Sequence, residues 1–243
     1  GKKETQIPLN PSLSFTLSNC NTECIIKYEP IKKPNNQCNF ELLFEGKREI
    51  LFEEKLNIFF KRIVFYCPYL LNLKLIIETK NSFPHSSGIA SSASAYSAFS
   101  LCIMDIEKKI NPTISSEYFF NKSSFLSRLG SGSASRSVLG PLAIWGESNV
   151  FKHSSNFFAV KYEEKLHSNF KNIQDTILLV DKGKKHISST LGHDLMINHS
   201  FSKDRLVQVD QNLKLLNNAL ISGDFEAFIH IVELEALTLH AMM

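Results

Sequence analysis

Small hydroxyl side chains and alanines gather in residues 81–99, where an expected strand gives way to an expected helix. The strand is Leu73–Thr79, and the helix is indicated by residues at i, i+4, i+7 spacing: Ile89, Ala93, Tyr96 and Phe99 or Ser100. A helix start presents backbone N–H groups that lack partners, with the positive end of the helix dipole behind them. Ser91 and Ser92 add hydroxyl donors there. This chemistry suits a polyphosphate, although such a helix start is by itself more typical of a tight packing surface.

A second stretch, Gly130–Arg136, combines serine hydroxyls with a single arginine. The Arg136 guanidinium offers a planar fork of donors that suits one carboxylate. The two glycines and the serines predict a turn outside the hydrophobic core. On its own, a helix cap with a solvent-exposed arginine is the better interpretation.

Both stretches match signatures of one known family. The pattern Pro-x3-Gly-Ile-Ala-Ser-Ser-Ala at residues 84–93 resembles the phosphate loop of the GHMP kinase superfamily. The pattern Gly-Ser-Gly-Ser-Ala-Ser-Arg-Ser at residues 130–137, with Gly140 and Trp145 after it, resembles the second signature of mevalonate diphosphate decarboxylases. Further matches, at residues 1–2 with 8–17 and at residues 185–192, lie in the family's order, so the resemblance covers the whole chain.

The resemblance implies an ATP-dependent decarboxylase that converts (R)-5-diphosphomevalonate to isopentenyl diphosphate in the mevalonate pathway of isoprenoid biosynthesis. The 3-hydroxyl is phosphorylated first, and the phosphate then leaves as the carboxylate is lost. ATP and Mg²⁺ are the implied cofactors, with magnesium bound mainly through the phosphates. Two alternatives stay open. One is a kinase of mevalonate derivatives or a decarboxylase of the monophosphate, and the other is a GHMP-fold protein that binds ligand without catalysis.

The resemblance also assigns residues to roles. Those expected to bind ATP are Pro84, Ser87, Gly88, Ala90, Ser91 and Ser92. Those expected to bind the substrate are Lys2, Asn10, Ser131, Gly132, Ser133, Ala134, Ser135, Arg136 and Thr190. Lys2 and Arg136 have expected catalytic roles, with Arg136 on the carboxylate. The family's catalytic Asp lies in an Asp-Ala-Gly-like motif that these 243 residues do not contain, so no Asp is assigned.

The composition is that of a globular protein and argues against several other classes of protein. With 243 residues, 43% of them hydrophobic and 21% charged, the chain can bury a large core. A net charge of +3 without a dense basic run argues against a nucleic-acid partner. Five cysteines without a Cys-x2-Cys pair, and scattered histidines, predict reduced thiols in the cytoplasm and no protein-ligated metal. No apolar run is long enough to span a membrane.

The order of the expected elements predicts an α+β fold with a mostly antiparallel or mixed sheet, because strands precede helices without βαβ alternation. The expected strands are residues 11–18, 24–28, 40–44, 47–52, 73–79, 142–145, 157–162 and 176–180. The expected helices are residues 53–66, 115–129, 204–222 and 224–243, one that starts near residue 89, and one capped by residues 188–190.

The resemblance divides this fold into two domains. It implies a ribosomal-protein-S5-like N-terminal GHMP domain over residues 1–170, and the start of a ferredoxin-like C-terminal domain over residues 171–243. We expect the sequence to lack both natural ends and the second domain to be incomplete. A homodimer is the expected assembly.

Overall fold

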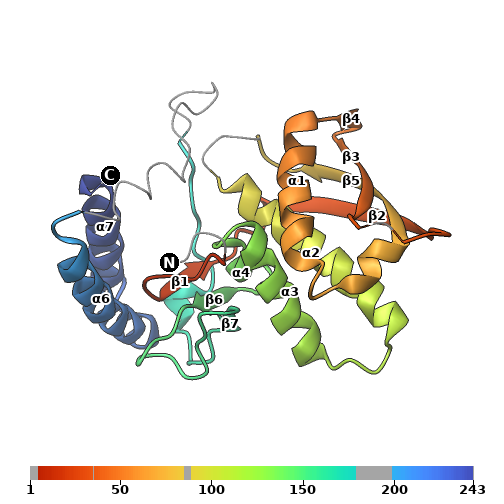
Figure 1. The fold of residues 1–243 in the computed structure, drawn as a ribbon. Helices are drawn as coiled ribbons and strands as arrows, with labels where there is room; N and C mark the ends of the chain where they lie inside the picture. The colour runs from red at the N-terminus through yellow and green to blue at the C-terminus, as the bar shows by residue number, and fades with distance from the viewer. Residues whose placement is uncertain (1–4, 35, 85–88, 179–198, 243) are drawn as a thin grey trace.

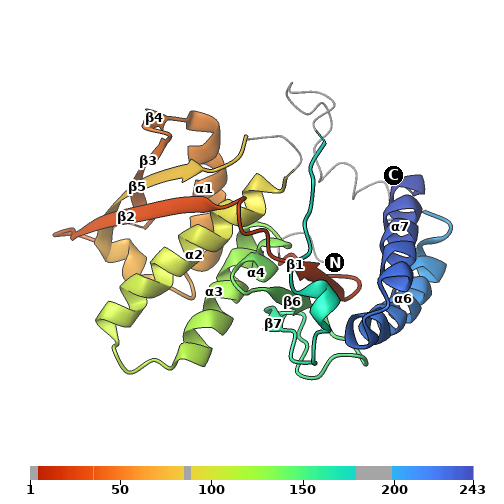
Figure 2. The same cartoon turned by 180° about the vertical axis from the view of Figure 1, so that it is seen from behind.

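The computed structural model describes residues 5–34, 36–84, 89–178 and 199–242 of the chain. A four-stranded sheet with helices on one side forms one part of the molecule. A three-stranded sheet lies between that part and a pair of long helices near the C-terminus, as Figures 1 and 2 show from opposite sides. This arrangement confirms the expected α+β class.

The larger sheet has the strand order β2-β5-β3-β4 and is mixed. Its strands are β2 (Thr22–Pro30), β5 (Leu73–Asn81), β3 (Asn39–Phe44) and β4 (Lys47–Arg48). β2 runs antiparallel to β5, whereas β3 runs parallel to it. Leu75 and Ile77 of β5 are fully buried against helices, while the opposite face carries charged pairs such as Lys27–Glu78 at 2.7 Å.

Three helices share the hydrophobic core beneath this sheet. They are α1 (Ile50–Ile63), α2 (Ser91–Ile110) and α3 (Ser116–Gly130). Phe59 of α1 and Ile103 of α2 belong to the same hydrophobic cluster as β5, and Leu126 of α3 completes it. α3 begins at an N-cap, because the Ser115 hydroxyl accepts from the Tyr118 N–H at 3.1 Å. α1 and α2 thus pack against the sheet, and α3 packs against these two helices.

The smaller sheet joins two segments that lie far apart in the sequence. β1 (Ser12–Phe15) pairs with β6 (Leu142–Trp145), and β6 pairs with β7 (Val160–Lys161), all antiparallel. β6 is buried on both faces: Ile144 packs toward α6, and Ala143 packs on the opposite side with Leu139 and Ala159. The sheet therefore holds α4 (Ala134–Ser137) on one side and the C-terminal helices on the other.

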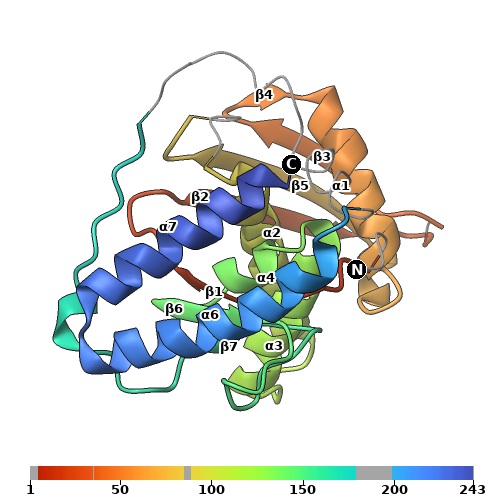
Figure 3. The same cartoon turned by 90° about the vertical axis from the view of Figure 1, so that its left-hand side faces the viewer.

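The C-terminal helices, α6 (Ser202–Ser222) and α7 (Phe225–Ala241), lie side by side along the smaller sheet (Figure 3). α6 ends at Gly223, which has a left-handed φ of 84°, and the Asp224 carboxylate caps α7 by accepting from the Ala227 N–H at 2.9 Å. Both signals were expected from the sequence, and both are confirmed. Glu235 of α7 accepts from Arg205 of α6 at 2.9 Å, which ties the pair together.

Several expected elements have different bounds in the structure. The strand expected over 47–52 ends at Arg48, and α1 begins at Ile50 instead of residue 53. The Arg48 Nε donates to Glu53 Oε1 at 2.7 Å across the first helical turn, which favours the early start. The strand expected over 157–162 is limited to Val160–Lys161, because residues 157–159 bond to α3 side chains.

The strand expected over residues 176–180 is wrong for its described part, residues 176–178. Residues 176–178 have no strand partner, and residues 179 and 180 lie outside the described residues. The helix expected after residues 188–190 also lies outside them up to residue 198, and residues 199 and 200 are not helical.

All five cysteines are described, and all are free thiols. Burial raises the pKa of Cys38 and of Cys67 to about 11, so these two thiols stay protonated near neutral pH. Within the described part of the chain, no helix combines the length and apolar character needed to cross a bilayer.

Candidate functional site

The two stretches of interest lie against one another where α2 passes the end of α3. The Tyr96 ring of α2 covers Gly130, and a Cβ at Gly130 would lie only 2.3 Å from Tyr96 Cδ1. Arg62 of α1 also reaches this point, because its Nη1 donates to the Leu129 carbonyl at 2.7 Å. The structure places Arg62 at the second stretch and leaves Lys61 exposed.

Replacing Gly130 with Ala should lower the free energy of unfolding by about 1–3 kcal/mol, because the Tyr96 ring must move to admit the methyl group. Urea titration would measure the change. The matched control is the same substitution in a Tyr96→Ala background, where the space is open and the cost should be much smaller. An equal cost in both backgrounds would mean that the ring is not the reason.

Arg136 is a half-buried cation without a matching anion among the described residues. Its Nη1 donates to the Ser12 hydroxyl of β1, and its guanidinium lies 6.0 Å from the centroid of the Trp145 ring. Its Nε is shielded from solvent and has no hydrogen-bond partner, and no ion pair among the described residues includes it. Burial lowers the pKa of Arg136. An anionic ligand would satisfy both the charge and the free donor.

Two residues of the turn that carries Arg136 lie in the buried interior, which corrects the expectation from the sequence. Ala134 and Ser135 are fully buried in the short helix α4. Their small side chains let α4 pack closely under α2 and α3. The Ser135 hydroxyl donates to the Gly132 carbonyl at 2.9 Å, which closes the turn. Ser131, Gly132 and Ser133 remain half-buried at the entrance to α4.

β1 contributes a residue that the sequence did not single out. Hydroxyl and apolar side chains alternate over residues 12–18, and Ser12, on the hydroxyl face, is half-buried and contacts Arg136. The same alternation was the available signal, since it placed Ser12 on the polar face. Asn10, in contrast, donates from Nδ2 to its neighbour Pro11 at 2.9 Å, and no bond from Asn10 to Arg136 is formed.

The start of α2 forms the second half of the site. Ala90 precedes the helix with φ 54° and ψ 42°, a left-handed conformation that is uncommon for a residue with a side chain, and no side chain caps the helix. Ser91 and Ser92 line a cavity of about 70 Å³ together with Phe52, Lys55 and Tyr96, among others. Phe52 and Lys55 were missed because they come from α1, far away in the sequence.

The remaining expected site residues do not lie in either half of the candidate site as described. Pro84 is described and exposed. Ser87, Gly88, Lys2 and Thr190 lie outside the described residues, so their assignments stay predictions.

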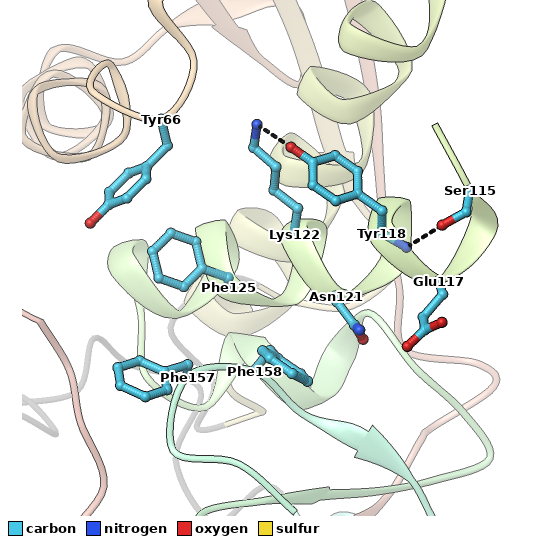
Figure 4. A pocket seen from close by; sticks show the side chains of 9 residues that line it. All are labelled: Tyr66, Ser115, Glu117, Tyr118, Asn121, Lys122, Phe125, Phe157 and Phe158. Carbon is cyan, nitrogen blue, oxygen red and sulfur yellow. Dashed lines mark hydrogen bonds between the residues drawn. The ribbon is translucent and has the colours of Figure 1, made fainter. Parts of the chain in front are cut away.

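A larger groove, of about 790 Å³, lies on the outer side of α3 (Figure 4). Aromatic side chains line much of it, including Tyr66, Phe125 and Phe157. Its cation, Lys122, is already paired with Glu107 at 2.7 Å and bonded to the Tyr118 hydroxyl at 3.1 Å. Because the Lys122 charge is neutralised by Glu107, this groove attracts an anionic ligand less strongly than the surroundings of Arg136 do.

Comparisons with known proteins all find diphosphomevalonate decarboxylases. Residues 1–157 match the family model described as the diphosphomevalonate decarboxylase-like N-terminal domain. The chain is 28% identical to the diphosphomevalonate decarboxylase of Schizosaccharomyces pombe, over 99% of this chain and 62% of that protein. The chain thus spans less than two thirds of that relative.

Solved structures are similar in fold as well. A mevalonate diphosphate decarboxylase from Legionella pneumophila matches with a TM-score of 0.73 and 27% identity, over 99% of this chain and 71% of that one. A structure described as MDDEF in complex with MVAPP, AMPPCP and magnesium matches with a TM-score of 0.75 and 25% identity, over 98% of this chain and 68% of that one.

Proposed function

Because the chain belongs to the diphosphomevalonate decarboxylase-like family, we propose that the whole protein catalyses the ATP-dependent decarboxylation of (R)-5-diphosphomevalonate. The products are isopentenyl diphosphate, CO₂, ADP and phosphate. The observation that carries the proposal is the Arg136 guanidinium, which is half-buried, has no ion-pair partner among the described residues and keeps a free Nε donor that is shielded from solvent. A substrate that brings a carboxylate into the protein interior would supply the missing anion.

Arg136 is held in a way that suits this role. Ser12 accepts from Nη1 on one side, and the Trp145 ring flanks the guanidinium. A cation fixed in this manner needs little reorganisation when the carboxylate arrives. The hydroxyls of Ser131 and Ser133, at the entrance to α4, are proposed to contact the remainder of the substrate.

The start of α2 is proposed to bind the ATP phosphates. It is an uncapped helix N-terminus with Ser92 exposed beside a cavity, and such termini favour anions. The structure described with AMPPCP and magnesium supports a nucleotide in this family. Magnesium, bound through the phosphates, would neutralise charge on the transferred phosphoryl group. The catalytic Asp stays unassigned; Asp210 is paired with Lys214 at 3.2 Å on α6.

The test is to incubate the full-length protein with ATP, magnesium and (R)-5-diphosphomevalonate, and to measure CO₂ and ADP separately. We expect one CO₂ for each ADP. ADP without CO₂ would contradict decarboxylation and favour a kinase. Binding of both ligands without either product would favour the ligand-binding protein.

Three further expectations stay predictions. They are the division into residues 1–170 and 171–243, the homodimer and the cytoplasmic location. Limited proteolysis and light scattering of the full-length protein would test the first two.

A further inference from the structure

Three serines of α3 are fully buried, and one of them, Ser124, has side-chain bonds to described residues outside the helix. Ser123 donates to the Phe119 carbonyl at 2.7 Å, and Ser127 donates to the Ser123 carbonyl at 2.6 Å, both within α3. Ser124 instead donates to the Ser135 carbonyl at 2.8 Å and accepts from the Ala159 N–H at 2.8 Å. Its hydroxyl therefore links α3 to both α4 and the segment before β7.

Arg128 reinforces the same link one helical turn later. Its side chain is only 2% exposed, and its Nε donates to the Phe157 carbonyl at 2.8 Å. Its Nη1 donates to the Thr5 carbonyl. Ser124 and Arg128 together fix the backbone of residues 157–159 against α3.

That segment leads directly to the site. The Trp145 Nε1 donates to the Asn156 carbonyl at 3.1 Å, next to the residues that α3 holds. The same indole flanks Arg136, and a Cβ at Gly132 would lie 2.9 Å from its Cη2. Ser124 thus bears on Arg136 in two ways: through the Ser135 carbonyl, in the residue before Arg136, and through the segment that fixes Trp145.

We propose that Ser124 is a positioning residue that sets the orientation of the Arg136 guanidinium. The proposal rests on the function proposed above. Ser124 is fully buried and acts through its neighbours. Without the Ser124 hydroxyl, the Ser135 carbonyl and the Ala159 N–H lose a hydrogen-bond partner. The turn that carries Arg136 must then shift to restore these bonds.

The first measurement compares Ser124→Ala with Ser127→Ala, a matched control in the same helix that is equally buried. Calorimetry on the full-length protein would give Kd for (R)-5-diphosphomevalonate and for AMPPCP with magnesium. We expect Ser124→Ala to raise Kd for diphosphomevalonate about tenfold and to leave Kd for AMPPCP unchanged. Ser127→Ala should change neither. A Ser124→Ala protein that matches Ser127→Ala would overturn the proposal.

The second measurement needs no ligand, so it separates this proposal from the proposed function. In the ligand-free protein, hydrogen exchange of residues 132–137 should be faster in Ser124→Ala than in Ser127→Ala. If the wild-type protein binds no diphosphomevalonate, the proposed function is wrong, and the exchange data still decide the role of Ser124. If Ser124→Ala does not fold, Ser124→Cys keeps a weak donor of similar shape and should show the same changes to a smaller degree. No change in that variant would equally overturn the proposal.

Discussion

Replacement of Arg136 with Ala in the full-length protein should lower kcat/KM about 1,000-fold and leave the fold intact. The substrate carboxylate would enter a buried site without its cation, and an unpaired buried charge is costly. The fold should survive, because Arg136 has no carboxylate partner among the described residues and its removal leaves none of them unpaired. Its loss also removes a desolvated charge, so Tm should stay level or rise. ADP release and a thermal melt measure the two effects.

Two controls sharpen this test. Arg136→Lys should also be poor, because an ammonium group cannot reproduce the planar fork that bonds Ser12 and keeps Nε for the ligand. Lys27→Ala, at an exposed lysine paired with Glu78 on the outer face of the larger sheet, should leave kcat/KM close to that of the wild type. Wild-type turnover in Arg136→Ala would remove Arg136 from the mechanism.

Replacement of Ala90 with Glu should weaken nucleotide binding at least about 100-fold. Ala90 is exposed at the uncapped start of α2, where we propose that the phosphates bind, so a carboxylate there would repel them at close range. Calorimetric titration with AMPPCP and magnesium would measure the loss.

The controls for Ala90 separate charge, bulk and backbone strain. Ala90→Gln has nearly the same size as Glu without the charge and should lose much less affinity. Ala90→Gly adopts a φ of 54° without strain and should keep the affinity. Retention of nucleotide affinity in Ala90→Glu would place the phosphates elsewhere.

The parts of the fold that sequence reasoning predicted well depend on local chemistry. The boundary between α6 and α7 follows from a left-handed Gly223 and a capping Asp224, which act within a few residues. The start of α1 was missed because an apolar run such as Ile50–Phe52 fits a strand or a helix equally well. The Phe52 ring packs on the Phe44 ring with centroids 5.2 Å apart, and this contact is compatible with either a strand or a helix at Phe52.

In the candidate site, too, the local sequence pattern was predictable and the contacts between distant residues were not. The residues of the turn before Arg136 could be picked out from their pattern, but their burial could not. The partners that make Arg136 unusual come from distant positions: Ser12 lies 124 positions away in the sequence, and the Ser124 bond to Ala159 spans 35. Such contacts leave no periodic signal in a single sequence, so only the folded chain reveals them.

The Tyr96 ring has a thermodynamic consequence. One part of it lines the cavity at the start of α2, and another part covers Gly130 without room for a methyl group. A ligand that shifts the ring at one of these places changes the free energy at the other. Such linkage is reciprocal by necessity, so a nucleotide at α2 and an anionic substrate at Arg136 would change each other's affinity by the same factor. The side chain at position 96 would then set the size of that factor.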